Sequence, residues 1–138
     1  MNAVQTRRVL QMLAAAVAGL FGIATLLAGG RVLLGSDPGY VVYRPLLIYN
    51  TTMGIAYLAA GVIMWRSVIR GRYAAGAIVL LNLLVLLGIV LVSRNGGAVA
   101  VDSLRAMTLR TVVWLVLYLI LFWLARAPDV ARARHVER

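Results

Sequence analysis

The hydrophobic positions of this chain fall into four long blocks that are separated by short polar segments. The blocks cover Val9–Gly30, Leu46–Trp65, Ala74–Ser93 and a last stretch that ends at Ala125. Each block is close to the ~20 residues that an α-helix needs to cross the hydrocarbon core of a bilayer. The pattern predicts an all-α polytopic membrane protein built as a four-transmembrane-helix bundle.

We place the four helices at residues 9–34, 45–67, 73–93 and 103–126, followed by a basic tail over residues 127–138. The first block is longer than the ~7–15-residue apolar region of a signal peptide, so we expect a retained first helix. Because the spans use nearly the whole length, we expect a single transmembrane domain over residues 1–138, with no soluble enzyme or receptor domain.

Composition agrees with a bilayer as the solvent. Hydrophobic residues make up 63% of the chain and the mean hydropathy is +0.93, whereas a soluble domain is ~45–50% apolar. The net charge of +10 is divided among short segments on both sides of the expected membrane. Since no continuous basic face results, we expect no nucleic-acid partner. The chain has no cysteine, which excludes disulfides and thiolate metal sites.

The arginines are unevenly distributed between the two sides of the expected bundle. Counted through alternating spans, nine lie on the side of both termini and five on the other side. The positive-inside rule places the side with more arginine in the cytoplasm. We therefore expect cytoplasmic termini and two outer loops with the remaining arginines, which are Arg31, Arg44, Arg94, Arg105 and Arg110.

Small residues mark one face of the first span, where Ala14, Ala18 and Gly22 are spaced by four. Such a stripe lets the backbone of another helix approach closely. Packing within the chain is one interpretation of the stripe, and a homodimer contact is the other.

The second span is the least lipid-like of the four, because Asn50, Gly54, Tyr57 and Gly61 recur on one helix face. An unpaired amide in hydrocarbon costs several kcal/mol, so this face should point into the bundle. The third span has a single polar interruption, Asn82, near the middle of the membrane. A lone asparagine there predicts a hydrogen bond to a neighbouring helix and not a ligand site.

Arg110 raises the question of a binding site. It precedes Arg126 by sixteen residues, or roughly 24 Å of helix, while the hydrocarbon core is ~30 Å thick. The side chain is therefore slightly submerged unless it snorkels to the interface.

One interpretation of this position is that Arg110 belongs to a polar cluster beneath the outer surface. The cluster would form where the start of the second span meets the start of the fourth. Five arginines and two carboxylates on that side leave a positive charge, which suits an anionic headgroup, a small anion or an acidic patch of a partner protein. Scattered interface anchors are the alternative. The candidate binding residues are Arg44, Tyr49, Asn50, Asp102, Arg105 and Arg110.

Residues that carry chemistry are missing from the spans. None of them contains Asp, Glu, His or Lys in its interior, and the single histidine, His135, lies in the tail. No nucleophile with a base and no set of metal ligands can be assembled. We expect no enzymatic activity, no metal and no cofactor.

Two segments resemble a group of small bacterial four-helix membrane proteins. The first is Leu46-Leu47-Ile48-Tyr49-Asn50 followed by Gly54, Tyr57 and Gly61, which is similar to the group's aromatic-Asn pair and its Gly-x-x-Tyr-x-x-x-Gly pattern. The second is Arg105-Ala106-Met107-Thr108-Leu109-Arg110 followed by Trp114, which looks like the start of the group's last helix. In the group a glutamate often precedes the first of these arginines, whereas here the nearest acid is Asp102.

The resemblance implies the four-helix architecture, a bacterial inner-membrane location and a role for Tyr49, Asn50, Arg105 and Arg110, but no reaction. Our leading hypothesis is a non-enzymatic accessory or scaffold subunit that binds a partner membrane protein or anionic lipid through the polar cluster. The alternative is a minimal transporter or channel for a small anion, which would act as a homo-oligomer because four helices enclose little lumen.

Overall fold

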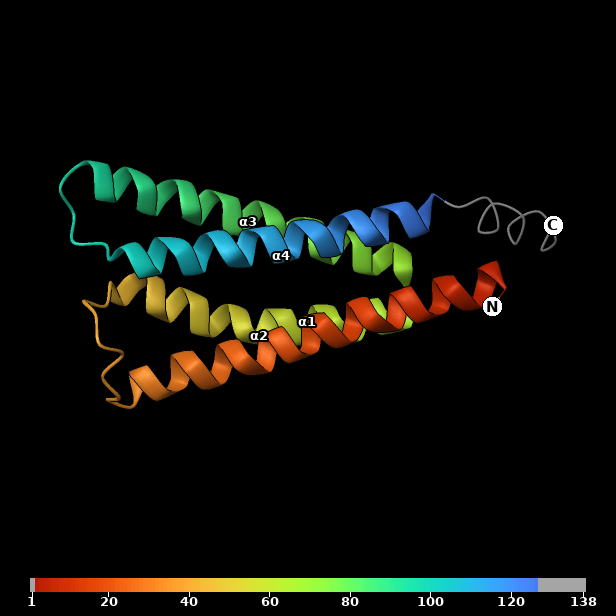
Figure 1. Cartoon of the computed structure of the whole chain (residues 1–138), viewed down its shortest axis with the longest axis horizontal. Helices are drawn as coiled ribbons and strands as arrows, with labels where there is room; N and C mark the ends of the chain where they lie inside the picture. Colours follow the sequence, from red (N-terminus) through yellow and green to blue (C-terminus); the bar gives the residue numbers. More distant parts are fainter. Residues whose placement is uncertain (1, 127–138) are drawn as a thin grey trace.

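The computed structural model describes residues 2–126, which contain four α-helices: α1 (Ala3–Leu33), α2 (Arg44–Arg66), α3 (Val68–Arg94) and α4 (Val101–Ala125). Successive helices run in opposite directions (Figure 1). The N-terminus, the α2–α3 junction and the end of α4 lie together at what we call the terminal end. The α1–α2 and α3–α4 loops lie at the other end, the loop end (Figure 1). The predicted tail over residues 127–138 lies outside the described residues.

All four helices are long and apolar enough to cross a membrane. This confirms the prediction of an all-α chain with four potential spans. Large hydrophobic side chains are exposed on every helix, as Leu20, Ile55, Leu84 and Leu119 show with 52–67% exposure. A soluble protein rarely leaves so much apolar surface in contact with water. The exposed hydrophobic side chains on the outside of the bundle are instead suited to contact with lipid acyl chains.

The bundle packs as two helix pairs that meet in a shared core. α1 lies mainly against α2 and α3 mainly against α4, while α2 also contacts α3. The α1–α2 contact is built from small residues, and Ala14, Ala18 and Gly22 are all buried in it. A Cβ added at Gly22 would come within 2.9 Å of the carbonyl oxygen of Gly54. The two backbones therefore approach as closely as glycine permits.

The junction between α2 and α3 is a single residue, Ser67, in an extended conformation with φ −154° and ψ 121°. Its hydroxyl oxygen accepts a hydrogen bond from the backbone N–H of Arg70 at 3.3 Å and so caps α3. The sequence predicted a loop over residues 68–72, but α3 begins at Val68. Arginines lower the hydropathy of this stretch without interrupting the helix, because charged side chains are solvated where a span leaves the membrane.

A side chain of α1 satisfies the last turn of α2. Nε2 of Gln11 donates hydrogen bonds to the carbonyl oxygens of Met64 at 2.7 Å and Trp65 at 3.2 Å. The last carbonyls of a helix have no partner within it, so this contact both satisfies two of them and fixes α1 against α2.

Candidate functional site

Arg110 lies well inside the length of α4. It follows the start of the helix, Val101, by nine residues and precedes its end, Ala125, by fifteen, which places it ~14 Å and ~22 Å from the two ends. If α4 crosses a core ~30 Å thick, the Cα of Arg110 lies at the depth of hydrocarbon. Its side chain is half-buried and does not extend along the outside of the bundle.

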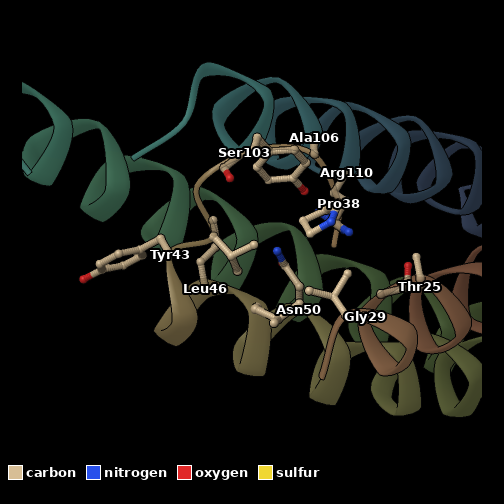
Figure 2. A pocket seen from close by; sticks show the side chains of 14 residues that line it. Thr25, Gly29, Pro38, Tyr43, Leu46, Asn50, Ser103, Ala106 and Arg110 are labelled. Carbon is tan, nitrogen blue, oxygen red and sulfur yellow. The ribbon is translucent and has the colours of Figure 1, made fainter. Parts of the chain in front are cut away.

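A pocket of about 240 Å³ opens beside this guanidinium at the loop end of the bundle. Helices α1, α2 and α4 form its walls, and the α1–α2 loop contributes Pro38 and Tyr40. Figure 2 shows the guanidinium of Arg110 and the side-chain amide of Asn50 pointing into the same space from α4 and α2. We call this the Arg110 pocket. Its polar lining residues are Thr25, Tyr40, Tyr43, Asn50, Ser103 and Arg110.

No carboxylate in residues 2–126 pairs with Arg110. Asp102 lies 3.6 Å from the guanidinium of Arg105, and both of these side chains are largely exposed. The Oδ1 atom of Asp37 accepts a hydrogen bond from the backbone N–H of Gly39 at 2.8 Å. Nε of Arg110 is buried without a hydrogen-bond partner. Within the described chain the charge of Arg110 is therefore uncompensated.

The polar groups around this charge in the described residues are neutral. The hydroxyls of Tyr40, Tyr49 and Tyr57 are near enough to interact with it electrostatically, and Asn50 shares the pocket. Oδ1 of Asn50 is buried and also has no hydrogen-bond partner. The pocket thus combines a cation with an amide oxygen, and neither Nε of Arg110 nor Oδ1 of Asn50 has a hydrogen-bond partner within residues 2–126.

A second polar arrangement lies deeper in the bundle. Tyr49 and Tyr57 of α2 each donate a hydrogen bond to Oδ1 of Asn82 on α3, both at 3.1 Å. Asn82 is completely buried, and its Nδ2 atom has no partner. The ring of Tyr57 packs on that of Trp114, with ring centroids 4.8 Å apart. Because Trp114 follows Arg110 by one helical turn, this core lies next to the Arg110 pocket.

The structure brings together two of the six predicted binding residues, Asn50 and Arg110. Tyr49 does not line the pocket, since adjacent helical residues point ~100° apart. Its hydroxyl bonds to Asn82 and interacts with the charge of Arg110 only electrostatically. Arg105 precedes Arg110 by five residues, which turns it ~140° around α4. It pairs with Asp102 on the surface. Arg44 is exposed and lies outside the Arg110 pocket.

The predicted packing residues lie in the interior of the bundle. Gly54, Tyr57 and Gly61 are buried on α2 and Asn82 is buried on α3, while the stripe of Ala14, Ala18 and Gly22 faces α2 as described above. A Cβ at Gly61 would lie 3.1 Å from the carbonyl oxygen of Ala15. The stripe is therefore used within the chain, as the first of the two interpretations expected.

Sequence reasoning did not include Thr25, Tyr40 and Ser103 in the candidate site. Thr25 and Ser103 are almost fully buried. Thr25 continues the spacing of Ala14, Ala18 and Gly22 by three residues, so it lies on the α1 face that packs against α2. Tyr40 comes from the loop, whose path over the pocket depends on tertiary contacts and not on a local pattern.

A guanidinium presents its donors in a fixed planar fork that matches two oxygens of a carboxylate or phosphate. The Arg110 pocket can therefore bind an oxyanion, to which the Nδ2 group of Asn50, and not its Oδ1 atom, can donate a hydrogen bond. Comparisons of the chain with protein-family models, with curated proteins and with solved structures found no match.

Proposed function

We propose that this chain is a non-enzymatic membrane protein that binds an anionic group in the Arg110 pocket and acts as an accessory or scaffold subunit. The observation that carries the proposal is the charge of Arg110, which lies between three helices without a carboxylate partner in residues 2–126. An arginine at hydrocarbon depth costs ~2.5–3.5 kcal/mol or more, and such residues usually mark a functional site. A bound anion would offset that cost.

The pocket favours a small ligand group. Its volume of about 240 Å³ is below the ~300–1,000 Å³ of sites for drug-sized molecules. Pro38 and Tyr40 of the α1–α2 loop also line the pocket and add to its walls at the loop end. A phosphate fits these limits better than the side chains of a protein surface, whether it belongs to a lipid headgroup or is free in solution.

We place the protein in a bacterial inner membrane with its termini in the cytoplasm. At the terminal end the described residues include six arginines and no carboxylate: Arg7, Arg8, Arg66, Arg70, Arg72 and Arg126. At the loop end Asp37 and Asp102 accompany the arginines. The positive-inside rule supports this orientation, and the resemblance to small bacterial membrane proteins supports the location.

Thermal unfolding of the purified protein in a neutral detergent tests the anion site. The additions are short-chain phosphatidylglycerol, phosphatidylcholine of the same chain length, and inorganic phosphate. We expect phosphatidylglycerol or phosphate to raise the melting temperature, because a ligand that binds only the folded state stabilises it. Stabilisation by phosphatidylglycerol alone identifies a lipid headgroup as the source, and stabilisation by both identifies the phosphate group itself.

Two variants separate the pocket from general surface charge. Arg110→Gln should abolish the shift. Arg105→Gln is the matched control, because it removes the same charge from an exposed position on the same helix, and it should retain the shift. An equal loss in both variants, or no shift with any anion in the unmodified protein, would contradict the proposal.

A small-anion transporter is the second candidate. It is favoured by the hydrogen-bonded Tyr49, Tyr57 and Asn82, which extend polar groups from the Arg110 pocket toward the interior of the bundle. Transport would require assembly of several copies, because these side chains fill the core of one bundle. Liposomes containing the protein should then pass chloride or phosphate, and Arg110→Gln should stop the flux. An impermeable vesicle at all protein densities would exclude this candidate.

A further inference from the structure

A groove of about 680 Å³ runs along the outside of the bundle between α1 and α2, away from the Arg110 pocket. Its lining includes Ala16 and Gly19 on α1 and Ala59, Val62 and Trp65 on α2. A Cβ added at Gly19 would meet no atom within 4 Å. The groove forms because the residues beside the α1–α2 contact are also small and leave the space between the two helices unfilled.

The two ends of the groove differ in charge. Toward the terminal end it reaches Arg66, which also lines an adjoining pocket with Ser67 and Arg70. Both arginines are exposed. The carboxylates of the described chain, Asp37 and Asp102, belong to the loop end. An apolar groove with a cationic end is complementary to an amphipathic anion, which has an apolar chain and a negatively charged head.

The length of the groove agrees with one lipid leaflet. From Ile55, near its far end, to Arg66 there are eleven residues of α2, or ~16 Å of helix. Half of a hydrocarbon core that is ~30 Å thick is ~15 Å. A chain that fills this groove would therefore place its headgroup at the level of Arg66, where Trp65 also suits the membrane interface.

We propose that this groove binds an anionic phospholipid, with an acyl chain over Ala16, Gly19 and Ala59 and the phosphate at Arg66 and Arg70. The charge of the groove argues for a lipid over a second copy of the chain. In residues 2–126 a parallel copy would present arginines and no carboxylate to Arg66. The site is independent of the Arg110 pocket, which lies at the opposite end of the bundle.

Trp65 provides a direct probe of occupancy, because bromine atoms on an acyl chain quench the fluorescence of a tryptophan that they touch. Trp114 is completely buried, whereas Trp65 and Trp123 are each 59% exposed. The experiment uses the full chain with Trp123→Phe in liposomes, so that Trp65 is the one exposed tryptophan. Brominated phosphatidylglycerol and brominated phosphatidylcholine are compared at equal mole fractions.

We expect brominated phosphatidylglycerol to bind beside Trp65 roughly fivefold more strongly than brominated phosphatidylcholine, about the effect of one arginine near a charged surface. Arg66→Gln with Arg70→Gln should remove this preference. Ala59→Leu, at an exposed position, should reduce quenching by both lipids. Arg94→Gln, at the loop end, and Arg110→Gln should leave the preference unchanged, so that the two proposals fail or succeed separately.

Equal quenching by the two lipids would overturn the proposal, as would a preference that survives in the double arginine variant. Weak quenching by both lipids, together with crosslinking between copies of an Ala59→Cys variant, would identify the groove as a contact between two chains and would equally overturn the proposal. The unchanged emission of Trp114 serves as the check that each variant is folded.

Discussion

The hydroxyl of Tyr57 donates a hydrogen bond to Oδ1 of Asn82 at 3.1 Å, and both side chains are completely buried. This bond joins α2 to α3 at a depth where neither group has water as an alternative partner. Tyr49 donates to the same oxygen from a position two turns earlier on α2. One amide oxygen therefore sets both the rotation and the axial position of α3 relative to α2.

Removal of one partner in this contact should destabilise the bundle modestly. We expect Tyr57→Phe to lower the free energy of unfolding by about 1 kcal/mol, which is the usual range for hydrogen bonds between membrane helices. Unfolding in mixed micelles with increasing denaturing detergent measures it. In a double-mutant cycle, Tyr57→Phe should cost less in an Asn82→Leu background than in the unmodified protein. Strictly additive effects would show that the bond contributes nothing.

Two glycines of α1 should respond in opposite ways to the same substitution. A Cβ at Gly22 would lie 2.9 Å from backbone atoms of Gly54 and Leu58, whereas a Cβ at Gly30 meets no atom within 4 Å. We expect Gly22→Ala to destabilise the protein by about 1–3 kcal/mol through overpacking. Gly30→Ala should be neutral or stabilising by up to about 1 kcal/mol, because alanine favours the helix. The same unfolding titration compares them, and equal effects would contradict the close contact of α1 with α2.

Arg110→Met should stabilise the anion-free protein while abolishing the response to anions. The substitution removes a half-buried charge without a described partner, and an arginine at hydrocarbon depth costs ~2.5–3.5 kcal/mol, so we expect a gain in stability of up to about that size. The melting temperature in an anion-poor, neutral detergent measures the effect. Arg105→Met, on the exposed face of α4, should change it little. A marked loss of stability in Arg110→Met would mean that the guanidinium has a partner within the protein.

Gln11→Leu should loosen the terminal end of the α1–α2 pair. The carbonyls of Met64 and Trp65 would lose the donor that they share, and we expect a loss of about 1 kcal/mol in the free energy of unfolding. Hydrogen exchange should become faster in the last turn of α2 and remain unchanged in α4. Gln5→Leu is the control, because in residues 2–126 its side chain bonds to the exposed backbone N–H of Asn2 and not to α2. Unaltered exchange in α2 would contradict this contribution.

The absence of cysteine from the sequence allows the orientation to be measured with single introduced thiols. We expect Ser36→Cys in the α1–α2 loop to react with a membrane-impermeant maleimide on intact cells. Asn2→Cys should react only after the membrane is opened. The reverse pattern would place the Arg110 pocket on the cytoplasmic side, and labelling of both positions on intact cells would contradict the bundle topology.

Hydropathy predicted the four helices well because membrane insertion depends on a run of apolar residues of sufficient length. It was less accurate at Val68, since arginine lowers hydropathy but does not end a helix. Only Ser67 leaves the helical conformation there. The position of a helix end thus depends on the backbone conformation of a single residue, which hydropathy averaged over a window of residues does not detect.

The candidate site was harder to predict than the helices. Asn50 and Arg110 share a pocket because each lies on an inward helix face, and the helical period made this expectation possible. The same period, applied to α4, separates Arg105 from Arg110 by ~140° around the helix. The predicted cluster therefore included too many residues, because it grouped residues that are close in the sequence but lie on different faces of the helix. Tyr40 could not be assigned from a periodic pattern, because a loop follows the surfaces that it connects.

The single-residue connection at Ser67 determines where foreign sequence can be inserted into this protein. Two spans joined so tightly form one hairpin, and the chain there has no slack to accept foreign sequence. A fluorescent protein or protease site inserted at Ser67 would push the two helices apart and strip the cap from α3. Reporters belong in the α3–α4 connection over residues 95–100, which lines neither the Arg110 pocket nor the groove between α1 and α2.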